Sequence, residues 1–280
     1  PAAQWGPAAR CFPSLDWRED IVLLRYLRAR NGNVKKANAM LRSSLAWHAE
    51  VGSHRVGPWG LCGPDPATGQ PRLCGFAAAP LCAVPGGYLT GGFLGCDRDG
   101  SPIFWDRCGK LYPKAMLRHA DERDVIANEI FRNECITRLL RDASTDAKRF
   151  AQTTVVIDLH GLGFRHLYPR GLKCLKEIAR VGDDFYPERV KRVLIIHAPF
   201  IFSRLWSIIK MFFSENTRQK INIVSGDPTK MLTKFVPLES IPGFIKGGRA
   251  TIFGDPECRA LVNAGGRAPK AWAPSYTLPE

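Results

Sequence analysis

The sequence lacks the motifs that identify several large enzyme classes. It contains no Gly-x-Ser-x-Gly elbow, no Walker loop and no His-Glu-x-x-His helix. Gly161 and Gly163 lack the third glycine of a dinucleotide fingerprint. The six histidines are dispersed, so the pattern assembles no nucleophile, base and oxyanion hole. We therefore predict that this chain is not an enzyme and has no catalytic residues.

Long hydrophobic runs are also missing. No stretch approaches the roughly 20 apolar residues of a membrane-spanning helix, and no signal-peptide pattern is found. The nine cysteines are irregularly spaced and form no Cys-x-x-Cys pair. This pattern favours reduced thiols over a disulfide framework or a zinc site. We expect a cytoplasmic protein with no metal site and no cofactor.

Dense runs of one charge sign are absent as well, although the chain is strongly basic. The 40 Lys and Arg residues against 26 Asp and Glu give a formal net charge of +14, which attracts polyanions. Because the basic residues are scattered over predicted helices, the pattern favours an anionic membrane surface over nucleic acid. We predict peripheral membrane association and no nucleic-acid partner.

Strands and helices alternate along most of the chain. After two short helices, which begin at Asp16 and Asn33, residues 52–92 hold ten Gly and six Pro and are predicted to be irregular. The alternation that follows predicts an α/β fold with a mostly parallel sheet. Its expected strands are 102–106, 153–158, 190–197 and 221–224, and its expected helices are 121–141, 170–181, 203–213 and 228–235.

The most informative segment is 203–213, which we call the gate segment. The buried-strand pattern VLIIHA and Pro199 precede it, and seven of its eleven residues are bulky and apolar. It is either a core helix or the cover of a pocket for an apolar ligand, and the pattern alone favours the core. Its polar residues fall on one narrow face: Ser203, Arg204, Ser207 and Lys210.

Five motifs occur in order over roughly residues 16–248. They are LLRYLRARNGNVKKANAMLRSSLAWH, DRDGSPIFW, VVIDLHGLGFRHL, FYPERVKRVLIIHAPFIFSRLWSIIKMFFSENTRQKI and IPGFIKGG. Together they resemble the CRAL-TRIO lipid-binding family, in the branch of the yeast phosphatidylinositol/phosphatidylcholine transfer protein and its animal relatives. The resemblance implies a small helical unit followed by a parallel sheet that floors a lipid pocket, which the gate segment closes.

The resemblance also implies the site residues. A phosphoinositide headgroup site maps onto Arg30, Glu188, Thr217 and Lys220. The pocket and its gate map onto Phe200, Phe202, Leu205, Trp206, Ile209, Phe212 and Phe213. Taken alone, Glu188 and Lys220 could equally form a structural ion pair. Leu162–His166 stand where the family member that also carries phosphatidylcholine has small hydroxyl residues, which argues against a choline lipid.

We therefore expect a phospholipid carrier, with phosphatidylinositol as its cargo, that transfers or presents the lipid at membranes. Two alternatives stay open: a carrier of a neutral hydrophobe (tocopherol-like, retinoid-like or squalene), and a lipid-sensing regulatory or adaptor domain of a larger protein. The expected organisation is a frayed segment 1–15, a helical unit 16–52, an irregular segment 53–92, a lipid-binding domain 93–248 and a linker or disordered tail 249–280.

Overall fold

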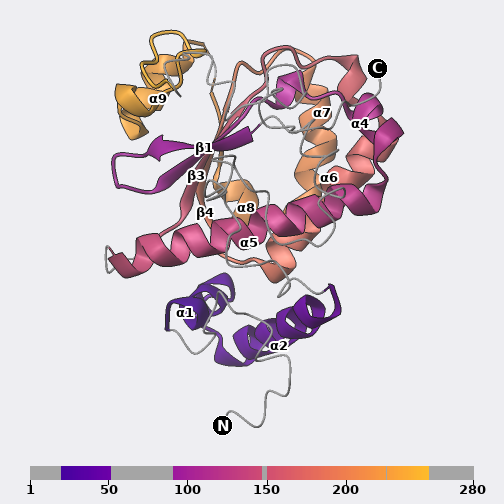
Figure 1. The fold of residues 1–280 in the computed structure, drawn as a ribbon, viewed down its shortest axis with the longest axis vertical. Helices are drawn as coiled ribbons and strands as arrows, with labels where there is room; N and C mark the ends of the chain where they lie inside the picture. The colour runs from indigo at the N-terminus through magenta and orange to yellow at the C-terminus, as the bar shows by residue number, and fades with distance from the viewer. Residues whose placement is uncertain (1–19, 52–90, 147–149, 225, 252–280) are drawn as a thin grey trace, which may run out of the picture.

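A five-stranded sheet forms the centre of the molecule (Figure 1). The computed structural model describes residues 20–51, 91–146, 150–224 and 226–251. The strand order is β1-β2-β3-β4-β5; β1 is antiparallel to β2, and the other pairs are parallel. The strands are β1 (Gly91–Cys96), β2 (Pro102–Asp106), β3 (Thr153–Asp158), β4 (Val190–Ile196) and β5 (Ile221–Ile223). The predicted α/β fold with a mostly parallel sheet is confirmed.

Helices cover both faces of this sheet. In Figure 1, α9 lies on one side of the sheet and α4, α6 and α7 lie on the other. The helices are α4 (Pro113–His119), α5 (Glu122–Asp146), α6 (Pro169–Phe185), α7 (Phe202–Ile209), α8 (Glu215–Gln219) and α9 (Pro228–Phe235). Short 3₁₀ turns complete the set: η4 (Cys108–Lys110), η5 (Phe164–His166), η6 (Lys210–Phe212) and η7 (Leu238–Ser240).

Strand alternation gives the two faces of the sheet different roles. Successive side chains of a strand point to opposite faces, so Val156 of β3 and Leu194 of β4 join Leu232 of α9 in the main core. The neighbouring positions Val155 and Val193 face the other side, where a cavity lies. Core side chains therefore cover one face of the sheet, and the other face lines the cavity.

The N-terminal unit consists of α1 (Asp20–Ala29) and α2 (Val34–Val51), which lie beside α5 in Figure 1. Asn33 caps α2 as predicted, since its Oδ1 accepts from the Lys36 backbone N–H at 3.0 Å. The capping box proposed for Asp16 and Glu19 lies outside the described residues.

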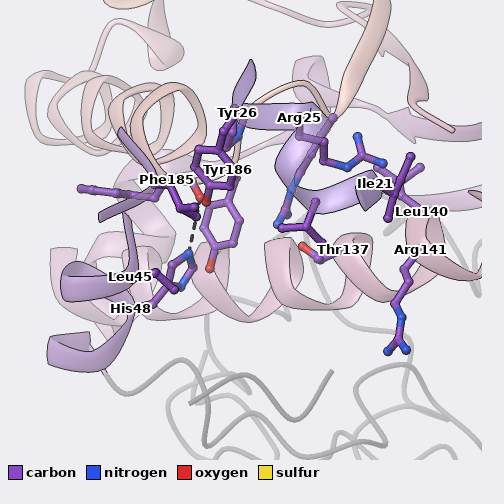
Figure 2. A pocket seen from close by; sticks show the side chains of 14 residues that line it. Ile21, Arg25, Tyr26, Leu45, His48, Thr137, Leu140, Arg141, Phe185 and Tyr186 are labelled. Atoms are coloured by element: carbon purple, nitrogen blue, oxygen red, sulfur yellow. Dashed lines mark hydrogen bonds between the residues drawn. The ribbon is translucent and has the colours of Figure 1, made fainter. Parts of the chain in front are cut away.

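A buried polar seam joins this unit to the end of α6 (Figure 2). The Phe185 carbonyl accepts from Ser44 Oγ at 3.1 Å, and His48 Nε2 lies 3.4 Å from the same oxygen. The Trp47 ring stacks on the Phe185 ring, with their centroids 4.0 Å apart. Beyond His48, the Tyr186 hydroxyl donates to Glu134 at 2.7 Å. The seam thus fixes the chain that leads from α6 into β4.

Several predicted boundaries were wrong. The gate segment is helical only to Ile209 and continues as the 3₁₀ turn η6. The helix predicted for 121–141 runs on to Asp146, and the one predicted for 170–181 extends over Pro169–Phe185. The strand predicted for 190–197 ends at Ile196; its residues Val193–Ile196 are buried, and Val190–Arg192 are half-buried.

Two predicted irregular segments contain ordered residues. Gly91 and Gly92 begin β1, and Ala250 is buried and bridges to Pro242. The predicted frayed segment 1–15 and residues 53–90 and 252–280 lie outside the described residues. Across the described ranges, no helix has the length and apolarity needed to cross a membrane.

Candidate functional site

A cavity of about 590 Å³ lies between the sheet and helices α4 to α7. This volume is within the range of about 300–1,000 Å³ that is usual for small-molecule sites. Its walls are mainly apolar because β3 and β4 present every second residue to it, and α5, α6 and α7 each turn an apolar stripe inward. Among the lining side chains are Phe104, Leu111, Met116, Val125, Ile136, Val155, Ile157, Leu172, Leu175, Ile178, Val193 and Ile195.

The gate segment closes one side of this cavity. Of the residues that the sequence assigned to pocket and gate, five line the cavity: Phe202, Leu205, Trp206, Ile209 and Phe213. Phe202 and Leu205 are buried, whereas Trp206 and Ile209 are half-buried. Phe212 is not among the lining residues, and Phe200 points away from the cavity with 89% of its surface exposed.

The outer face of the gate segment is partly apolar. Its polar residues Ser203, Arg204, Ser207 and Lys210 are exposed there, as the spacing predicted. Ile208 and Met211 are exposed on the same segment, at 41% and 69%, and Phe200 is exposed shortly before the segment begins. Large apolar side chains that face water singly are common, but here they are interleaved with two cations.

The four residues assigned to a headgroup all line the same cavity. Lys220 Nζ forms an ion pair with Glu188 at 3.1 and 3.2 Å to the two carboxylate oxygens. The Thr217 hydroxyl donates to Asp183 Oδ1 at 2.6 Å. Arg30, at the end of α1, is half-buried. Glu188, Thr217 and Lys220 therefore lie in a polar cluster at the amino ends of β4 and β5, and Arg30 lines the same cavity.

Glu188 is held in an unusual backbone conformation. Its φ of +53° is in the left-handed region, which costs a non-glycine residue roughly 1–2 kcal/mol. Arg25 Nη1 donates to the Glu188 carbonyl at 2.6 Å, and Gln152 Nε2 donates to its Oε2 at 3.0 Å. Burial, together with the nearby Arg189, lowers the pKa of Arg25 to about 10, so Arg25 keeps its charge at neutral pH. These contacts hold the carboxylate at the cavity edge.

Sequence reasoning missed other members of the cluster. Asp183 accepts from both Thr217 and the Ser214 backbone N–H, the latter at 2.7 Å. Asn216 Nδ2 donates to Glu188 Oε1 at 2.7 Å. Both Asp183 and Asn216 stand beside motif residues in the sequence, but neither lies in a pattern that predicts its partner. No group of side chains suited to a metal ion is present within the described ranges.

The sequence matches known proteins along most of its length. Residues 87–247 match the CRAL/TRIO domain, and residues 13–43 match the CRAL/TRIO N-terminal domain. The chain belongs to the CRAL-TRIO family. CRAL-TRIO domains are carriers that bind lipids and other hydrophobic molecules, so the apolar cavity is the place where such a ligand would bind.

Two curated CRAL-TRIO relatives are both named Protein real-time. The one from Aedes aegypti is 31% identical over 264 residues, which covers 92% of this chain and 36% of the relative. The one from Anopheles gambiae is 32% identical over 234 residues, which covers 80% of this chain and 31% of the relative. The chain thus spans about a third of the length of these relatives.

The crystal structure of Sfh5 shares the fold. It superimposes with a TM-score of 0.62 at 18% identity and covers 89% of this chain and 77% of Sfh5. At this level of identity the likeness establishes the CRAL-TRIO fold, and the architecture predicted from the motifs is confirmed.

Proposed function

We propose that the cavity binds a phospholipid, with phosphatidylinositol as its preferred cargo, and that the chain belongs to the phosphatidylinositol-transfer branch of the family. The observation that carries the proposal is that Arg30, Glu188, Thr217 and Lys220 all line one apolar cavity, where Glu188 and Lys220 form an ion pair. Acyl chains would lie among the apolar walls, and the headgroup would lie in this polar cluster.

The cluster has the donors and acceptors that such a headgroup needs. Lys220 and Arg30 can neutralise a phosphodiester, and the Thr217 hydroxyl can donate to a phosphate oxygen. Glu188 can accept from inositol hydroxyls. Without a ligand, Lys220 is paired with Glu188 and Thr217 with Asp183. Binding therefore exchanges internal bonds for ligand bonds, which favours a ligand that offers both a phosphate and hydroxyls.

The apolar walls supply the rest of the free energy. Each methylene buried from water contributes about 0.8 kcal/mol, so a carrier must offer nearly the apolar environment of the bilayer. A cavity closed by the gate segment meets this requirement. No covalent step is needed, because movement of the gate segment is enough to admit or release the lipid.

The exposed face of the gate segment would contact the membrane during exchange. Arg204 and Lys210 would attract an anionic leaflet, at about 1 kcal/mol for each charge near the surface. Phe200 and Met211 would enter the interfacial region. The formal charge of +14 acts in the same direction over a longer range.

Transfer of labelled lipid between vesicles tests the headgroup assignment. We expect transfer of phosphatidylinositol, and we expect Lys220→Ala to lower its rate roughly tenfold or more, because a phosphate would lose a charged partner worth about 1.5–3 kcal/mol. The matched control is Lys234→Ala, an exposed lysine of α9 that does not line the cavity.

Each alternative has its own outcome in this assay. Transfer of a neutral hydrophobe that Lys220→Ala leaves unchanged would replace phosphatidylinositol with a tocopherol-like, retinoid-like or squalene cargo. Tight binding of phosphatidylinositol without transfer would identify a lipid-sensing domain. Equal loss of transfer in Lys220→Ala and Lys234→Ala would refute the headgroup site.

A further inference from the structure

The cavity contains a second group of charged side chains, away from the headgroup cluster. Glu129 and Arg132 of α5 and Asp106 of β2 all line it. Arg132 lies over the Phe104 ring of β2, with its Cζ 5.1 Å from the ring centroid. Lys220 directly precedes β5, three strands away from β2, which is about 14 Å at the usual strand spacing. This second group therefore adjoins the space assigned to acyl chains.

Within the group, Glu129 is fully partnered but Arg132 is not. Glu129 Oε1 accepts from Asn133 Nδ2 at 2.7 Å, and its Oε2 lies 2.5 Å from Arg132 Nη2. A guanidinium has five N–H donors, and Arg132 Nε is shielded from water with no hydrogen-bond partner in the described part of the chain. A cation with unused donors beside an apolar cavity is unfavourable unless a ligand supplies an acceptor.

The surrounding charges select the chemistry of that acceptor. Burial lowers the pKa of Arg132, but the carboxylates of Glu129 and Asp106 outweigh burial and raise the pKa above its ordinary value. Two carboxylates face one guanidinium, so an anionic ligand group is disfavoured here. A hydroxyl suits the site because its oxygen can accept from Arg132 while its hydrogen is donated to Asp106.

The neighbouring thiol does not change this balance. Burial, followed by the Asp106 carboxylate, raises the pKa of Cys108 well above its ordinary value. Cys108 is therefore a neutral thiol that adds no charge to the group.

We propose that Asp106, Glu129 and Arg132 form a second polar subsite, which binds a hydroxyl group carried on the hydrophobic part of the ligand, such as a hydroxylated acyl chain. The inference goes beyond headgroup recognition and rests on the proposed function only in that an acyl chain occupies the cavity. A ligand bound at both its headgroup and this hydroxyl would have a fixed depth in the cavity as well as a fixed orientation.

Matched fatty acids test the subsite in the full 280-residue chain. Oleic acid and its 12-hydroxy derivative, ricinoleic acid, compete with a fluorescent acyl probe for the cavity. We expect ricinoleic acid to bind roughly tenfold more tightly, the value of a hydrogen bond to a charged group. We expect 2-hydroxyoleic acid to show no such gain, because its hydroxyl stays beside the carboxylate.

Variants separate recognition from structure. The double variant Glu129→Leu/Arg132→Met removes the Glu129–Arg132 ion pair as a unit. We expect it to lose the preference for ricinoleic acid while retaining oleic acid. Arg123→Met, an exposed arginine of the same helix, should keep the preference. If circular dichroism shows that the double variant is unfolded, Asp106→Asn takes its place and must reduce the preference.

Equal binding of the two acids by the wild-type chain would overturn the subsite, as would a preference that survives in the variants. Lys220→Ala should weaken both acids alike and leave their ratio unchanged. A failure of the headgroup proposal would therefore be distinguishable from a failure of this one.

Discussion

Acidification should weaken the seam between the N-terminal unit and the lipid-binding domain through His48. This side chain is 3% exposed and packs edge-on against the Trp47 and Tyr186 rings. Figure 2 shows it beside Phe185 and Tyr186. Burial lowers its pKa from the ordinary 6.5 to about 3, and the nearby Arg189 acts in the same direction. The hydrogen bond to the Phe185 carbonyl acts against this shift of the pKa. The Glu134 carboxylate lies 3.5 Å from His48, but it is hydrogen-bonded to Tyr186 and lies in the field of Arg189.

The sign and size of the effect follow from proton linkage. The folded pKa is depressed, so the folded state stays neutral at His48 while the unfolded chain takes up a proton below about pH 6.5. Stability is therefore lost as the pH falls from 7 towards 3. Between pH 7 and pH 5 the free energy of unfolding should fall by about 2 kcal/mol through His48 alone.

Urea unfolding at several pH values, followed by circular dichroism, measures this loss. His48→Gln cannot titrate in this range and can still donate to the Phe185 carbonyl. Between pH 7 and pH 5 its free energy of unfolding should therefore fall by about 2 kcal/mol less than that of the wild-type chain. The free energy of unfolding of this variant will still depend on pH, because burial also lowers the pKa of His166. The protection factors of the α2 amides, which correct for the slower intrinsic exchange at low pH, should be smaller at pH 5 than at pH 7 in the wild-type chain only.

The same experiment can refute the reasoning. An identical pH dependence in the two chains would show that His48 does not titrate differently on unfolding. A wild-type chain that gains stability on acidification would show that Glu134 outweighs burial. The result also bears on function, since Arg25 of the same unit holds the Glu188 backbone.

Two further predictions concern the membrane face and the core. Phe200→Ser/Met211→Ser should weaken binding to anionic vesicles in a sedimentation assay roughly tenfold, because full burial of such side chains is worth about 1.5–3 kcal/mol each. The control Val34→Ser changes a residue of α2 that is 72% exposed and should leave vesicle binding unchanged. Equal losses in the two variants would refute this membrane face. Gly248→Ala should lower the free energy of unfolding by about 1–3 kcal/mol, since a Cβ there would lie 2.1 Å from the Pro242 carbonyl oxygen. Gly163→Ala, whose Cβ would meet nothing within 4 Å, should be tolerated in the same denaturation assay.

Regular elements with a clear period were predictable from the sequence. The strand Thr153–Asp158 and the helix Pro228–Phe235 have the predicted bounds, because alternating or near-continuous apolar residues and a Pro at the first helical position mark them. Strand β1 was not predictable in the same way, since its GGFLGC sequence has low strand propensity and is stabilised by pairing with β2.

The candidate site was predictable only where motifs mark it. Arg30, Glu188, Thr217 and Lys220 were found through the family resemblance, and the structure places all four at the cavity. Phe200 was assigned to the pocket and gate through the same resemblance, but the chain turns it outward before α7 begins. Glu129 and Arg132 were missed because no periodic pattern shows that two charged residues of α5 line the cavity.

The identity of the lipid bound by the purified chain tests the central claim most directly. Mass spectrometry of an organic extract should show phosphatidylinositol that co-purifies with the wild-type chain and is depleted from Lys220→Ala. An extract that contains no lipid, or only neutral lipids, would contradict the account.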